Sequence, residues 1–85
     1  METDALEVLS TREREVFYHV VKGEKNKAIA KALFISPRTV ETHRARIFQK
    51  LGIANLPDLV HFAIASRLIA LKLPESMYPV SKEAL

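Results

Sequence analysis

The sequence predicts an all-α fold, a compact four-helix bundle that contains a helix-turn-helix. Apolar residues recur at helical spacing in four segments, and no stretch alternates apolar and polar residues with the period of a strand. Each segment is flanked by residues that start or stop helices, and the connections are short. Because 85 residues leave room for one hydrophobic core, we expect a single domain.

The first two helices are expected over residues 11–22 and 26–34. Ser10 and Glu13 have the spacing of a capping box, and Gly23 follows the first helix as a stop signal. On a helical projection both segments have an apolar face that is suited to a core. The apolar residues on these inner faces are Leu9, Val16, Phe17, Val20, Val21, Ile29, Ala30 and Leu33.

The last two helices carry the clearest boundary signals. Ser36 is an N-cap followed by Pro37 at the first helical position, and Gly52 ends this third helix. Asn55 caps a fourth helix that we expect to continue to about Ile69 or beyond. The expected organisation is residues 1–8 as a lead or linker, 9–69 as the helix-turn-helix domain and 70–85 as a C-terminal tail of unassigned role.

The short connection over residues 34–36 predicts how the second and third helices cross. Helices joined this tightly cross steeply, so that the later helix projects from the surface, which is the geometry of a helix-turn-helix. On the third helix Val40, Ile47 and Leu51 form the inner stripe. The outer face holds residue types that contact base edges and thymine methyl groups, namely Arg38, Thr42, Ala45 and Gln49.

Charge is unevenly distributed along the chain. The total is +3, but residues 22–50 carry eight Lys or Arg against two Glu, a net charge of +6, which leaves −3 for the rest. A basic block of this size is as typical of a solvated surface as of a nucleic-acid site. The outer face of the third helix favours nucleic acid, because a solvated face normally carries Glu and Lys in pairs one turn apart.

The motifs in this order resemble the LuxR-type DNA-binding domain, the output domain of FixJ- and NarL-like response regulators and of quorum-sensing regulators. The resemblance implies a four-helix bundle whose third helix enters the major groove and whose fourth helix pairs two protomers, under the control of an N-terminal receiver or ligand domain. Residues 56–60 (LPDLV) are nearer the FixJ branch. The segments that carry the resemblance are 9–16 (LSTREREV), Gly23, 26–30 (NKAIA), 35–44 (ISPRTVETHR), Ile47 and 50–52 (KLG).

The resemblance also implies roles for individual residues: base contacts from Glu41, Thr42 and Ala45, and backbone contacts from Lys27, Thr39, Arg46 and Lys50. With the outer face of the third helix included, the expected base contacts are Arg38, Glu41, Thr42, Ala45 and Gln49. The expected DNA backbone contacts are Asn26, Lys27, Ser36, Thr39, His43, Arg46 and Lys50. The expected dimer interface is Phe62, Ala65, Ser66 and Ile69.

Three residues depart from the family pattern. Lys25 stands where Ser often caps the second helix, which leaves Asn26 as the alternative cap. Glu41 stands at a groove position often held by Lys, so the DNA sequence that this chain binds cannot be taken from that of better-known relatives. Arg67 replaces a Gly that commonly ends the fourth helix, which is why we expect that helix to run on past residue 69.

Several side chains have more than one interpretation. An ion pair between Glu13 and Arg44 would fix the third helix, with a contact from Arg44 to phosphate as the rival hypothesis. For His43, half-buried packing or a phosphate contact is favoured over a pH switch. Because Phe62 and Ile69 lie away from the inner face, the fourth helix is apolar almost all round, and a partner protomer is favoured over the tail as its cover.

Other classes of function find little support. The chain has no Cys, no nucleophile near a His and an acid, and no Gly-rich phosphate loop, so we expect no catalysis and no cofactor. The three His lie on different expected helices, which argues against a metal site. Without a membrane span or a leader, we expect a cytoplasmic protein.

The expected partners are double-stranded DNA and a second copy of the chain through the fourth helix, with RNA polymerase as a further candidate. Two alternatives stay open. One is a promoter-binding module like region 4 of a sigma factor, which would normally lack a long apolar fourth helix. The other is a helical protein-interaction module whose basic face meets an acidic partner.

Overall fold

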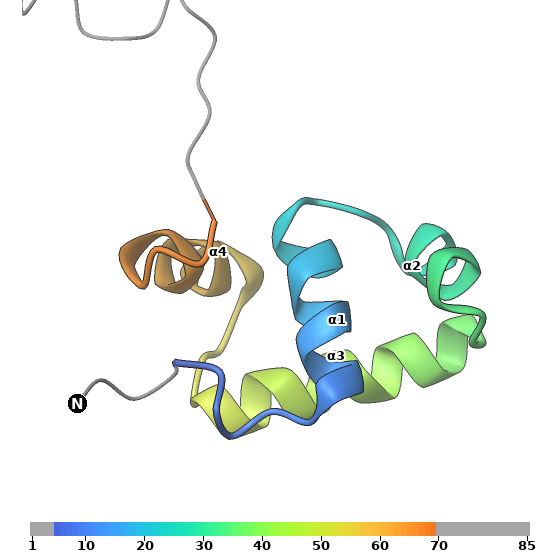
Figure 1. Cartoon of the computed structure of the whole chain (residues 1–85), viewed down its shortest axis with the longest axis horizontal. Helices are drawn as coiled ribbons and strands as arrows, with labels where there is room; N and C mark the ends of the chain where they lie inside the picture. The colour runs from blue at the N-terminus through green and yellow to red at the C-terminus, as the bar shows by residue number, and fades with distance from the viewer. Residues whose placement is uncertain (1–4, 70–85) are drawn as a thin grey trace, which may run out of the picture.

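The computed structural model describes residues 5–69, which form four helices (Figure 1). The helices are α1 (Thr11–Val21), α2 (Asn26–Leu33), α3 (Pro37–Leu51) and α4 (Leu56–Ala65). Residues 5–69 contain no strand, so the expected all-α class and four-helix bundle are confirmed. The expected tail over 70–85 lies outside the described residues.

α1 is the central helix of the bundle. It packs against α2, α3 and α4, while α3 packs against both α1 and α2. In Figure 1, α3 runs along one edge of the molecule, α2 lies over its N-terminal end, and α4 lies on the other side of α1. This arrangement gives α3 one face toward the bundle and one face along the outer edge.

The core is continuous and contains the residues that the helical projections assigned to the inner faces, except Leu33 and Leu51, which are partly buried and pack against it. Phe17 is fully buried at the centre and meets Phe62 edge to face, with ring centroids 6.4 Å apart. Leu6 is only 1% exposed, so the core begins within the segment expected to be a lead or linker. The buried apolar residues are Leu6, Leu9, Val16, Phe17, Val20, Val21, Ile29, Ala30, Val40, Ile47, Leu59 and Ala63.

Three of the expected N-caps are confirmed by their hydrogen bonds. The Glu13 N–H donates to Ser10 Oγ (3.1 Å) and the Ser10 N–H donates to Glu13 Oε1 (2.9 Å), which completes a capping box on α1. Ser36 Oγ accepts from the N–H of Thr39 (3.0 Å) at the start of α3. Asn55 caps α4 in the same way.

The C-terminal end of α4 corrects the expectation that this helix runs to about Ile69 or beyond. α4 ends at Ala65, because Arg67 takes the left-handed conformation (φ 60°) that usually favours glycine. The N–H of Leu68 then turns back to the carbonyl of Ala63 (2.8 Å). Leu68 and Ile69 pack against the core instead of extending the helix.

The ends of α1 and α2 differ from expectation by one residue each. α1 ends at Val21 and α2 ends at Leu33. Phe34 follows α2 in the left-handed conformation (φ 58°). The N–H of Ile35 donates to the carbonyl of Ala30 (3.0 Å), which closes the helix and starts the turn into α3.

Candidate nucleic-acid interface

The outer edge of α3 is exposed over its whole length. Val40 and Ile47 are 0% and 1% exposed, and they hold the helix to the bundle. The opposite face points to solvent, as the sequence predicted. The expected base-contact residues are all exposed: Arg38, Glu41, Thr42, Ala45 and Gln49.

The start of α3 is closed by hydrogen bonds within the chain. Pro37 has no N–H, and the N–H of Thr39 is taken by Ser36 Oγ. The Ser36 and Thr39 hydroxyls are also 2.9 Å apart and hydrogen-bonded to each other. Both side chains are exposed, so their remaining hydrogen-bonding capacity faces solvent at the end of α3 where the outer face begins.

The start of α2 is different, because no side chain caps it. Lys25 occupies the N-cap position and makes no side-chain hydrogen bond there, and Asn26 does not take over the role. The N–H groups of the first turn therefore lack a side-chain acceptor. Such groups, together with the positive end of the helix dipole, attract anions. The exposed side chain of Lys27 adds a positive charge to the same turn.

A hollow of about 320 Å³ brings the middle of α3 next to this end of α2. Arg44 contributes to its wall and is half-buried. The side chain of Arg44 and the uncapped first turn of α2 thus line the same surface depression. The lining residues are Val20, Gly23, Glu24, Lys25, Asn26, Arg44 and Leu56.

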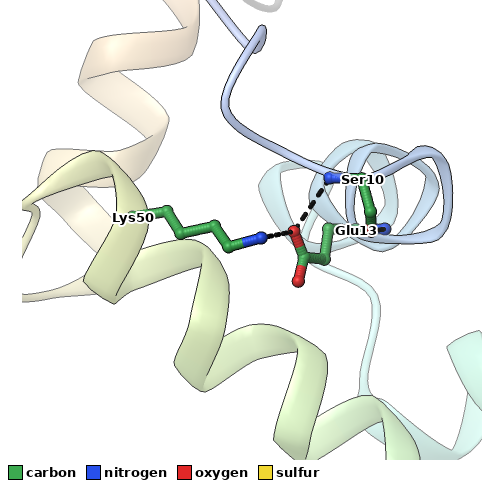
Figure 2. A network of polar contacts seen from close by, with 3 residues as sticks. All are labelled: Ser10, Glu13 and Lys50. Carbon is green, nitrogen blue, oxygen red and sulfur yellow. Dashed lines mark hydrogen bonds and ion pairs between the residues drawn. The ribbon is translucent and has the colours of Figure 1, made fainter.

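A half-buried ion pair joins the first turn of α1 to the last turn of α3 (Figure 2). Lys50 Nζ donates to Glu13 Oε1 (2.8 Å), and the same oxygen accepts the N–H of Ser10. The expected pairing of Glu13 with Arg44 was therefore wrong. Arg44 lies six residues before Lys50, which is about one and two-thirds helical turns, so it is offset by about 120° round the helix and about 9 Å along its axis.

The Glu13 carboxylate is charged although it is buried. Its side chain is 4% exposed, whereas that of Lys50 is 37% exposed. Burial raises the pKa of Glu13, but the hydrogen bonds from Lys50 and Ser10 outweigh it and leave the pKa below its ordinary value of 4.5. Because the ammonium of Lys50 is already engaged by Glu13, a phosphate contact from Lys50 would have to use its remaining donors.

His43 is half-buried on the flank of α3, as expected. Its Nδ1 is buried and has no hydrogen-bond partner among residues 5–69. A buried N–H without an acceptor costs more than a buried lone pair, so hydrogen bonding favours the tautomer with the proton on Nε2. Nε2 is then the donor that His43 can offer to a ligand. Arg46, on the same helix, is exposed.

The match to a known family decides what kind of domain this is. Residues 7–63 match the model of the bacterial regulatory proteins of the luxR family. The chain belongs to this family. The four helices are thus a LuxR-type helix-turn-helix domain, the DNA-binding output domain of a transcriptional regulator, which sets aside a sigma-factor region 4. The family is not a class of enzymes.

Individual relatives agree with the luxR-family assignment. The oxygen regulatory protein NreC of Staphylococcus aureus strain JH9 is 43% identical over 67 residues, which cover 79% of this chain and 31% of that protein. NreC of strain Mu3 matches equally well. In the crystal structure of full-length FixJ from B. japonicum, 32% of the chain superposes on 78% of this one with a TM-score of 0.73 and 36% identity. This chain spans about a third of the length of these relatives.

The expected dimer residues of the luxR-family domain are not all equally available. Phe62 is half-buried and packs on Phe17, so part of its ring belongs to the domain's own core. Ile69 is half-buried and also packs against the core. Ser66 is half-buried at the C-cap of α4, whereas Ala65 is exposed.

Metal and membrane sites find no support in the described part of the luxR-family chain. Within residues 5–69, no group of three or more His, Cys, Asp or Glu could hold a metal ion. In the same range no helix has the length and apolarity needed to cross a bilayer.

Sequence reasoning missed Lys50 as the partner of Glu13. The sequence gives only a weak indication of this pair, because Glu13 and Lys50 are 37 positions apart and several cations lie on α3. It also missed the surface depression beside α2, which depends on how α4 begins.

Proposed function

We propose that this luxR-family domain reads double-stranded DNA as a homodimer, with α3 of each protomer in a major groove. The observation that carries the proposal is the division of α3 into two faces. Val40 and Ile47 fix the inner face in the core, while Arg38, Thr42 and Gln49 stand exposed on the outer one. A projecting helix with such side chains matches the width and hydrogen-bonding pattern of a major groove.

Affinity and specificity would come from different residues. We assign base discrimination to Arg38, Glu41, Thr42, Ala45 and Gln49, at about 1–3 kcal/mol for each good contact. Glu41 is suited to accept a hydrogen bond from cytosine N4 and repels phosphate, so it would restrict the accepted sequence. We assign phosphate contacts, which release counterions and set the register, to Asn26, Lys27, Ser36, Thr39, His43, Arg46 and Lys50.

The uncapped first turn of α2 is suited to bind a DNA phosphate. Lys25 leaves the first-turn N–H groups without a side-chain acceptor. A phosphate oxygen would satisfy these donors and gain from the helix dipole and from the charge of Lys27. Arg44 lines the adjacent hollow, which favours its phosphate-contact role now that Lys50 holds Glu13.

The shape of the site supports the proposal of dimerisation through α4. One projecting helix covers only a few base pairs, whereas two related by a dyad would read an inverted repeat with half-sites about 10 base pairs apart. Ala65 is the exposed small residue on which a second α4 could approach closely. Phe62 and Ile69 would contribute only the parts of their side chains that their own core leaves uncovered.

The names of the relatives support a regulatory context. NreC is an oxygen regulatory protein and FixJ is a longer protein of which the matched part is about a third. We infer that this domain is the output module of a response regulator of a two-component system, whose regulatory domain controls access to DNA. Such a regulator acts on the chromosome in the cytoplasm, and RNA polymerase is the partner through which it would change transcription.

Selection of bound duplexes from a random DNA pool tests the proposed function. We expect enrichment of an inverted repeat and an affinity that falls steeply as salt rises. Binding to the selected site should be cooperative, and a half-site should bind much more weakly. Absence of any enriched sequence at moderate salt would refute specific recognition and favour the protein-interaction module. Independent, equal binding to isolated half-sites would refute the dimer alone.

A further inference from the structure

Among residues 5–69, Phe34 is the large apolar residue with the most exposed side chain. It is 94% exposed, compared with 57% for Val8 and 36% for Leu56, the other exposed large apolar residues in the described range. It lies in the turn between α2 and α3. Its ring therefore contributes almost nothing to the hydrophobic core.

The backbone conformation at Phe34 is also unfavourable for a phenylalanine. Its φ of 58° lies in the left-handed region, where a side chain with a Cβ is disfavoured and glycine is not. The turn itself is held by backbone bonds, from the N–H of Phe34 to Lys31 (3.4 Å) and from the N–H of Ile35 to Ala30 (3.0 Å). Neither bond needs the ring, so local stability does not explain a phenylalanine here.

The surroundings of Phe34 indicate what the ring would meet. Lys31, three residues before it in the last turn of α2, and Arg38, four residues after it in the first turn of α3, are exposed cations. Ser36, which we assign to phosphate, is two residues away, a span of at most about 7 Å. The apolar part of a DNA backbone is the carbon face of its deoxyribose, which lies beside each phosphate.

We propose that Phe34 packs on a deoxyribose of the DNA strand that passes the start of α3. The inference rests on the proposed DNA interface and adds to it an apolar contact that is independent of base sequence. An acidic protein is the alternative partner for Phe34 and the cations on either side of it. It would have to share the start of α3 with the duplex, so DNA is the favoured partner.

The test compares Phe34→Asn with Phe34→Leu on the full chain. Asn tolerates the left-handed backbone, so thermal unfolding should show a stability no lower than that of the original chain. On a selected duplex, Phe34→Asn should lower the affinity about three- to tenfold, and by the same factor on a random-sequence duplex. Phe34→Leu should retain most of the affinity.

The salt dependence separates this contact from an ionic one. Phe34→Asn should leave the slope of log affinity against log salt unchanged, whereas Lys31→Gln would reduce the slope by about one if Lys31 meets a phosphate. Val8→Asn removes another exposed apolar side chain and should leave DNA affinity unchanged, which makes it the matched control.

Unchanged affinity of the folded Phe34→Asn variant for both duplexes would overturn the proposal and favour a protein partner. A loss of affinity that depended on the identity of one base pair of the selected site would also overturn the proposal, because the ring would then contribute to sequence recognition. If the original chain binds no duplex at all, the proposed function fails first, and the two failures are thereby distinguished.

Discussion

Removing the charge of Glu13 or Lys50 tests how α3 is held in its reading position. Glu13 is 3% exposed and receives donors from Lys50 (2.8 Å) and Ser10 (2.9 Å). Glu13→Gln keeps the shape of the side chain and an acceptor for Ser10, but it loses the attraction between the carboxylate and the Lys50 ammonium. We expect it to lower the free energy of unfolding by about 1–2 kcal/mol.

Lys50→Met should cost more, because it leaves a buried carboxylate with only a backbone donor. Loss of one partner of a fully buried pair costs about 3–5 kcal/mol. The Lys50 side chain is 37% exposed, so solvent screens the pair, and we reduce the expected loss to about 2–3 kcal/mol. In a domain of this size each kcal/mol corresponds to a shift of about 4–8 °C in Tm.

A double-mutant cycle in urea, followed by helical circular dichroism, measures the coupling. We expect the double variant to lose about 1–2 kcal/mol less than the sum of the single variants. Arg12 and Glu15 provide the matched control on the same helix. They form a surface pair of 3.0 Å with side chains 43% and 47% exposed, and their coupling should be below about 0.5 kcal/mol. Additive losses for Glu13 and Lys50 would refute the anchoring role.

The pH dependence gives an independent check with a definite sign. The folded-state pKa of Glu13 is below its ordinary value of 4.5, so the unfolded chain binds this proton more tightly. The contribution of Glu13 is fully present above the unfolded pKa and is lost as pH falls through the lower folded pKa. The stability gap between the original chain and Glu13→Gln should therefore be constant near neutral pH and shrink below about pH 4.5.

Four further predictions concern α3 and α4. Gln49→Ala should change the preferred base at one position of the selected site, by about 1–3 kcal/mol, while thermal stability stays the same; an equal loss on every sequence would contradict its base-reading role. Asn55→Ala removes the bond that Asn55 Oδ1 accepts from the N–H of Asp58 (2.8 Å) and should lower the free energy of unfolding in urea by about 1 kcal/mol. Arg67→Gly should raise that free energy by about 0.5–1 kcal/mol, because the left-handed φ of 60° suits glycine; a loss of stability would show that the Arg67 side chain is needed. Ala65→Arg should weaken binding to the full inverted repeat but not to a half-site, as measured by fluorescence anisotropy, with Tm unchanged.

Local signals in the sequence predicted the helix starts well. Ser10, Ser36 and Asn55 each cap a backbone N–H only three residues away, so the interaction depends on little beyond the neighbouring sequence. The exposed face of α3 was predictable for a similar reason. Once Val40 and Ile47 are assigned to the core, helical geometry alone directs the opposite residues outward.

Tertiary contacts account for what the sequence did not predict. Arg67 adopts a conformation that its own preference opposes, and the chain there folds back so that Leu68 and Ile69 reach the core. Glu13 pairs with Lys50 and not with Arg44 because of the way α1 and α3 cross. A helical projection of one helix gives no information about this crossing. The half-burial of Phe62 likewise depends on where the ring of Phe17 lies.

The way α3 is attached explains how it can present so many polar side chains. Only Val40 and Ile47 are fully buried along its 15 residues, with Phe48 and Leu51 partly buried. Its N-terminal end is closed by its own cap at Ser36, and α2 packs against the helix. Its last turn is tied to α1 by Lys50 and Glu13. Because these attachments use none of the residues assigned to base contacts, substitutions at those positions should change sequence preference with little effect on stability, whereas changes at Glu13 should lower stability.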